Sequence, residues 1–165
     1  MNWTMIFIEM AVYIVLFTAV VMIPAFKNPV LGIHNYPPEI QEEYFKTHER
    51  IPTAPLCKRT VLIKSLGILI FAVLLAGGAL LAGADSFGEG FLFSVLLFGA
   101  VGIYDTLLID WVLFAKLKMF RLPGTEHMDK EYAQKWFHVK GMLFPGSLYA
   151  VILGLIVGGA VALLR

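Results

Sequence analysis

The chain has 165 residues, of which 59% are apolar and only 15% are charged, and its mean hydropathy is +0.78. This composition departs from that of soluble globular proteins toward lipid, so it argues against a soluble protein. The formal net charge of +1 gives no basis for nucleic-acid binding. The one cysteine, Cys57, cannot form an intrachain disulfide, and we interpret it as a residue without a special role.

Four long apolar runs follow one another along the chain, at residues 4–26, 61–83, 91–115 and 141–164. Each has the roughly 20 residues that a helix needs to cross a hydrocarbon core about 30 Å thick. The first run is too long for the apolar part of a signal peptide, so we expect it to be retained as an anchor. The sequence therefore predicts an all-α integral membrane protein, a single domain in which four transmembrane helices form an antiparallel bundle.

The basic residues predict the orientation of this bundle. Twelve of the 13 Lys and Arg residues fall into two clusters, at residues 27–64 and 116–140. The positive-inside rule then places segments 27–60 and 116–140 in the cytoplasm and both termini outside, in the plasma (inner) membrane.

Glycines in the fourth run predict close helix packing. Gly154 and Gly158 have the spacing that lets two membrane helices approach closely. Packing within one chain is the simpler interpretation, and a homo-oligomer formed through the fourth helix is the alternative.

The first cytoplasmic segment is expected to contain a short helix. Pro37 and Pro38 precede the helix-compatible run 40–48, and proline is favoured in the first turn of a helix. Ile40 and Tyr44 would then share one apolar face.

The second cytoplasmic segment predicts one amphipathic helix over residues 125–140, lying along the inner interface. Its apolar stripe repeats every four residues, at Met128, Tyr132 and Trp136. The opposite, polar face is expected to be solvated and carries His127, Glu131, Gln134 and His138.

A metal site on that polar face is the weaker interpretation. His127 and Glu131 are four residues apart and could share an ion, with His34 or His48 arriving from the other segment. A zinc site needs three or four converging ligands, and the sequence has neither a repeated histidine motif nor paired cysteines. We therefore predict no metal, and the sequence indicates no particular cofactor.

Three carboxylates fall inside the predicted spans, where an ionised group is costly and is a functional hypothesis by default. Glu9 is expected to reach the outer interface, and Asp110 is expected to pair with Lys64 of the neighbouring helix. Asp105 lies near the midplane with no cation at matching depth, so we expect it to hold a proton or a cation. On a regular α-helix Asp105 and Asp110 would point about 140° apart and would not form an acid pair.

These residues define a candidate site in the inner half of the bilayer. The predicted substrate-binding residues are Asp105, Asp110, Tyr104, Lys64, Tyr36 and Trp136. The candidate catalytic groups are Asp105, His34 and His138.

Three functions fit this sequence. The first is a small-molecule or lipid binding and transport protein with an acidic site. The second is a membrane-embedded enzyme that acts on a lipid or isoprenoid at the cytoplasmic leaflet. The third is a small accessory subunit of a membrane complex. Membrane lipids are the expected partners, with a second copy or another membrane protein left open.

Overall fold

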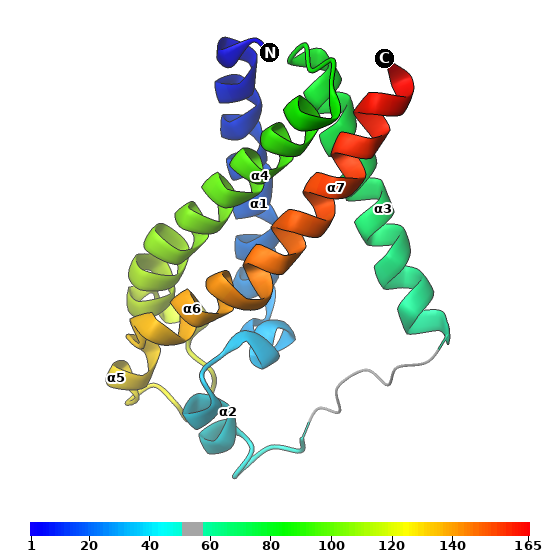
Figure 1. The fold of residues 1–165 in the computed structure, drawn as a ribbon. Coiled ribbons are helices and arrows are strands. Elements are labelled where there is room, and N and C mark those ends of the chain that lie inside the picture. Colours follow the sequence, from blue (N-terminus) through cyan, green and yellow to red (C-terminus); the bar gives the residue numbers. More distant parts are fainter. Residues whose placement is uncertain (51–57) are drawn as a thin grey trace. The chain divides into compact units, whose positions relative to one another are not determined.

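The computed structural model describes residues 1–50 and 58–165 (Figure 1). Cys57 lies outside the described residues, and so does the side chain of Lys64. Every element in the described part of the chain is helical. In chain order the elements are α1 (Trp3–Lys27), η1 (Pro29–Asn35), α2 (Pro38–Tyr44), α3 (Lys58–Leu81), α4 (Phe87–Tyr104), η2 (Asp105–Phe114), η3 (Lys118–Phe120), α5 (Asp129–Tyr132), α6 (Lys135–Gly141), η4 (Met142–Gly146) and α7 (Ser147–Leu164).

Within the described residues, four stretches are long and apolar enough to cross a membrane: Trp3–Lys27, Val61–Leu81, Phe87–Phe114 and Asp129–Leu164. They confirm the prediction of an all-helical chain with four helices of spanning length. Large apolar side chains on these stretches stay exposed, with Val20 at 70% and Leu81 at 74%. Apolar side chains exposed all along a helix are what a surface in contact with lipid requires.

Short polar caps define the ends of α1. The Asn2 side chain accepts hydrogen bonds from the backbone N–H groups of Thr4 (3.0 Å) and Met5 (3.3 Å), which have no partner inside the helix. After α1 ends at Lys27, Asn28 caps η1 by accepting from the N–H of Val30 at 3.0 Å. The chain therefore leaves the first long helix through a defined turn.

The described residues form two compact units. The first comprises residues 1–12, the described part of 51–100, and 145–165. Its buried side chains include a small-residue stripe on α3, at Ala72, Ala76 and Ala79, and α3 packs along α7. The N–H of Asn2 donates to the carbonyl of Ala82 at 2.6 Å, so the start of α1 is tied to the turn between α3 and α4. Figure 1 shows both termini at the same end of this unit.

Glycines on α7 are used for packing within the chain. A Cβ on Gly158 would stand 2.7 Å from the carbonyl oxygen of Phe87, and one on Gly154 would stand 2.8 Å from the ring of Phe91. Only a residue without a side chain allows α4 to approach α7 so closely. Gly154 and Gly158 therefore allow α4 and α7 to pack within one chain, which was the simpler prediction. A homo-oligomer stays a prediction.

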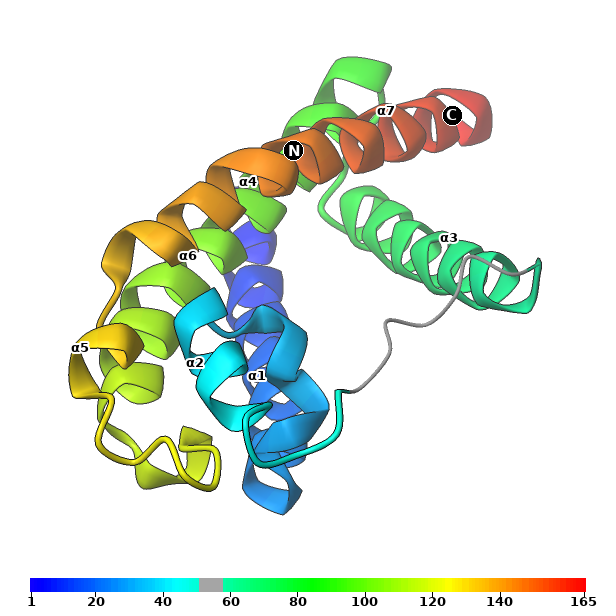
Figure 2. The same ribbon diagram turned by 90° about the horizontal axis from the view of Figure 1, so that it is seen from below.

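The second unit comprises residues 13–50 and 101–144, and its core is aromatic. Figure 2 shows α2, α5 and α6, three short helices of this unit, from below. Ile40 and Tyr44 are both buried in the core, as predicted from their shared face, although α2 spans Pro38–Tyr44 instead of residues 40–48. The other buried members are Ala25, Ile33, Tyr36, Phe114, Phe120, Leu122 and Tyr132.

The prediction of one helix over residues 125–140 is wrong. The helix is interrupted after Tyr132, because Gln134 takes non-helical dihedrals (φ −71°, ψ 81°) and α6 begins anew at Lys135. The break separates the predicted apolar stripe: Tyr132 is fully buried, whereas Trp136 is 72% exposed. Tertiary contacts of Tyr132 outweigh the helical periodicity here.

Two of the long apolar stretches depart from regular α-helix in the residues that belong to the second unit. The third stretch changes from α-helix to π-helix at Asp105 and stays so to Phe114. In the fourth, Phe144 leaves helical geometry (φ −150°, ψ 121°) immediately before Pro145. A proline disfavours the helical conformation of the residue before it, which explains this second break.

Candidate functional site

An aspartate–histidine pair joins η2 to α6 in the second unit. His138 Nδ1 lies 3.1 Å from Asp110 Oδ2, and both side chains are largely buried, with exposed fractions of 8% and 19%. When the Nδ1–H donates to the carboxylate, the other ring nitrogen is left as a proton acceptor in the neutral ring. That nitrogen, Nε2, is buried and has no hydrogen-bond partner among the described residues.

Asp105 belongs to the same cluster because the backbone there is a π-helix. In this geometry each N–H bonds to the carbonyl five residues earlier, so residues five apart lie nearly one above the other. Asp105 and Asp110 therefore share one side of η2, and the 140° separation expected from a regular α-helix does not apply. The half-buried Asp105 carboxyl lies within electrostatic range of Asp110 and His138. Three titratable groups thus form a single acidic–imidazole cluster.

Polar contacts hold the backbone around this cluster. The Thr18 hydroxyl donates to the carbonyl of Ile14 (2.7 Å), which leaves it to accept from the Tyr104 hydroxyl at 2.9 Å. The Thr106 hydroxyl donates to the thioether sulfur of Met142 at 3.4 Å. The second contact joins the π-helical segment η2 directly to the kinked segment η4, so the two irregular stretches support each other.

Aromatic rings close the cluster on its other side. The ring of Phe114 lies 5.2 Å from His138 in an edge contact and 4.9 Å from Tyr36. Phe114 therefore connects the cluster to the aromatic core of the unit, and it keeps the imidazole in place by packing.

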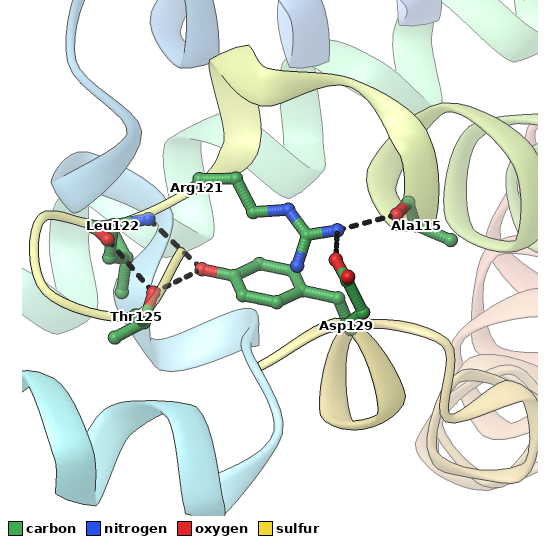
Figure 3. A network of polar contacts seen from close by, with 6 residues as sticks. Ala115, Arg121, Leu122, Thr125 and Asp129 are labelled. Atoms are coloured by element: carbon green, nitrogen blue, oxygen red, sulfur yellow. Dashed lines mark hydrogen bonds and ion pairs between the residues drawn. The ribbon is translucent and has the colours of Figure 1, made fainter. Parts of the chain in front are cut away.

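Arg121 organises the segment that follows η2 (Figure 3). One of its nitrogens, Nη2, donates to the carbonyl of Ala115 and to Asp129 Oδ1, both at 2.8 Å. Its guanidinium lies 3.9 Å from the centre of the Tyr132 ring, which is a close cation–π contact.

The hydroxyl of Tyr132 completes this network. It accepts from the N–H of Leu122 at 2.9 Å. The Thr125 hydroxyl donates to the carbonyl of Leu122 (2.9 Å), so the Tyr132 hydroxyl in turn donates to Thr125 (2.8 Å). The Tyr132 and Thr125 hydroxyls are thus both satisfied, whereas Arg121 Nη1 is buried and has no hydrogen-bond partner among the described residues.

The structure changes the interpretation of the predicted polar face of residues 125–140. His127 is exposed as expected and Glu131 is half-buried, but His138 is turned inward to Asp110. A solvated role for His138 is therefore wrong, because the break before α6 rotates it away from the other three residues. No group of three or more His, Cys, Asp or Glu side chains that could hold a metal ion occurs in the described part of the chain.

Three further predicted site residues of this unit, His34, Tyr36 and Trp136, are not members of the cluster. His34 is exposed on η1, and Tyr36 is buried, with its hydroxyl donating to the carbonyl of Phe120 at 2.9 Å. Trp136 lines a surface pocket together with Trp111, Lys135 and Val139. The Lys64–Asp110 pair falls on a side chain outside the described part of the chain and stays a prediction, as do the substrate-binding roles of Tyr36 and Trp136.

Glu9 makes a helix contact that was not predicted from the sequence. Both of its carboxyl oxygens are buried and have no hydrogen-bond partner among the described residues, and the group contacts Gly78 of α3. The Glu9 carboxyl therefore packs against α3, which the sequence did not predict, and its reach to the outer interface stays a prediction. The missing signal was Gly78, whose bare backbone makes room for a carboxyl.

Comparison with known proteins adds no family to this geometry. No protein-family model, no curated protein and no solved structure matches the chain.

Proposed function

We propose that this chain is a four-pass integral membrane protein that binds a small amphipathic molecule or lipid at the cluster of Asp105, Asp110 and His138. Binding is linked to the uptake and release of a proton by the cluster, and the protein carries its ligand between the inner half of the bilayer and the cytoplasm.

One observation carries this proposal: the buried pair of Asp110 and His138 with Asp105 beside it. Acidic and imidazole side chains within apolar helices are expensive unless they pair, and they mark proton relays and substrate pathways in membrane proteins. A carboxylate–imidazole pair can exchange a proton near neutral pH without leaving an isolated charge.

The irregular backbone supports binding rather than packing alone. Non-helical backbone at membrane depth is tolerated where protein buries it or where it lines a cavity, and transporters place broken helices at their substrate sites. Here the π-helical η2 carries both aspartates, and the kink at Phe144 follows Met142, which η2 contacts.

We propose an antiparallel bundle with both termini outside and segments 27–60 and 116–140 in the cytoplasm. The even number of apolar stretches and the two basic clusters support this topology. It is tested with a membrane-impermeant maleimide on intact cells. Cys57 should be protected, whereas Asp85→Cys in a Cys57→Ser background should be labelled; the reverse pattern would contradict the orientation.

The binding proposal is tested by native mass spectrometry of the protein released gently from its own membrane. Wild type should retain a small molecule or lipid that Asp105→Asn loses. Asp85→Asn is the matched control, since Asp85 is exposed in the turn between α3 and α4. The same ligands in all three samples would refute the acidic site. Another polypeptide retained in all three would favour an accessory subunit.

A second function, an enzyme acting on a lipid or isoprenoid, is favoured by one observation. His138 Nε2 is a buried acceptor whose ring is oriented by Asp110, which is the arrangement of a general base. His138→Ala separates the two: an enzyme should still bind its ligand while the lipid composition of the producing cells changes. If the protein is a transporter, His138→Ala should change both the binding of the ligand and the distribution of the ligand across the membrane.

A further inference from the structure

A pocket whose lining does not include Asp105, Asp110 or His138 is formed by residues of η2 and α6. Its volume is about 410 Å³, and it is lined by Trp111, Lys135, Trp136 and Val139. That volume is within the range of small-molecule pockets. Two indole rings and one aliphatic side chain make its walls apolar, and one ammonium supplies its only charge.

Lys135 is held at the wall of this pocket. The indole N–H of Trp111 donates to the carbonyl of Lys135 at 3.3 Å, and the Lys135 ammonium lies 4.9 Å from the centre of the Trp111 ring. This is a cation–π contact. Lys135 has no carboxylate partner within the described ranges, 1–50 and 58–165, so its charge is available to an anion.

The rest of α6 has the composition of a membrane–water interface. Trp136 is 72% exposed, and an indole with one apolar side and one polar edge is characteristic of the headgroup level. Further exposed lysines are Lys140 on the same helix and Lys116, Lys118 and Lys130 earlier in segment 116–140. This concentration of positive charge complements an anionic leaflet.

We infer that this pocket binds an anionic phospholipid of the inner leaflet, with an acyl chain against Trp111, Trp136 and Val139 and the phosphate on Lys135. A free phosphate would leave the apolar walls uncovered, whereas a phospholipid satisfies the walls and the ammonium together. The inference rests on the membrane location proposed above and is independent of the acidic site.

The test uses quenching of tryptophan fluorescence by brominated lipids. The chain has three tryptophans, and Trp3→Phe leaves only the two in the pocket. This variant is reconstituted in phosphatidylcholine vesicles that contain an equal fraction of either dibrominated phosphatidylglycerol or dibrominated phosphatidylcholine. We expect stronger quenching by the brominated phosphatidylglycerol.

Lys135→Gln should reduce this preference roughly fivefold, the effect of one cation near an anionic surface. Lys130→Gln is the matched control, since it removes one exposed positive charge outside the pocket, and it should reduce the preference less than Lys135→Gln does. Equal quenching by the two lipids, or a preference unchanged in Lys135→Gln, would overturn the lipid site. No quenching by either lipid would instead overturn the membrane location, so the two failures are distinguishable.

Discussion

The carboxyl of Glu9 on α1 occupies the space that a side chain would take on Gly78 of α3. The two helices approach there because Gly78 has no Cβ, and the ring of Phe93 lies against the same point, 3.2 Å from where that Cβ would be. An acid is thus packed among apolar neighbours with neither oxygen hydrogen-bonded within the described residues. Such a group is costly unless it is protonated or binds a cation.

Gly78→Ala should destabilise the protein by about 1–3 kcal/mol, because the new methyl group has to displace the Glu9 carboxyl from a packed site. Gly77→Ala is a close control, since a Cβ there meets nothing within 4 Å. It should be neutral or stabilising by up to about 1 kcal/mol. Thermal unfolding in detergent measures both. Adding Glu9→Ala should relieve the defect of Gly78→Ala; an equal defect in the double variant would show that Glu9 is not the obstacle.

Gly158→Ala should also destabilise the protein, by about 1–3 kcal/mol. Its methyl group would meet the backbone carbonyl of Phe87, which cannot rotate away. Gly159→Ala, one position along α7, has open space and should unfold at the wild-type temperature or slightly above it. The same unfolding assay applies. Equal unfolding temperatures for the two variants would argue against the close contact of α4 and α7.

The lengths and order of the helices could be predicted from the sequence because they depend on local apolar content alone. The four apolar runs and the stretches of spanning length agree to within a few residues at most ends. Ile40 and Tyr44 were also predictable, since their helical spacing places both on one buried face.

The site was less predictable because it depends on departures from regular helix. The partner of Asp110 in the structure is His138, which a continuous helix over residues 125–140 would have turned to solvent. The π-helix at Asp105 has no recognisable sequence signal here, yet it decides that the two aspartates share a side. The proline after Phe144 is a sequence signal for a break, and it lies inside the predicted run 141–164.

His138→Ala should destabilise the protein more than the loss of an exposed histidine, because it leaves the Asp110 carboxyl largely buried without its partner. Combined with Asp110→Asn in a double-mutant cycle, the coupling energy should be about 1–3 kcal/mol. His127→Ala is the control, since His127 is exposed, and it should change stability by no more than about 0.5 kcal/mol. Additive effects of the Asp110 and His138 changes would mean that the pair contributes nothing to folding.

Tyr36 should make the stability of the second unit sensitive to alkali. Burial, with a smaller contribution from the nearby Tyr132, raises the pKa of the Tyr36 hydroxyl above its ordinary value of 10.0. Below pH 10 the hydroxyl is protonated whether the chain is folded or unfolded, so its contribution is fully present. Above pH 10 the unfolded chain releases this proton while the folded chain keeps it, so stability falls as the pH rises, by up to about 1.4 kcal/mol per pH unit.

Tyr36→Phe separates this titration from the hydrogen bond of the same hydroxyl. The variant should lose about 1–3 kcal/mol at pH 8, because the buried carbonyl of Phe120 loses its donor. Its stability should also depend much less on pH in the alkaline range. Unfolding curves followed by circular dichroism from about pH 8 to about pH 11 would measure this dependence. Tyr149→Phe is the control, since that side chain is half exposed on α7 and should leave both quantities unchanged. If the stability of Tyr36→Phe still falls with pH as steeply as that of the wild type, another group causes the decrease. Burial of the Tyr36 hydroxyl in the aromatic core around Phe114 would then not explain it.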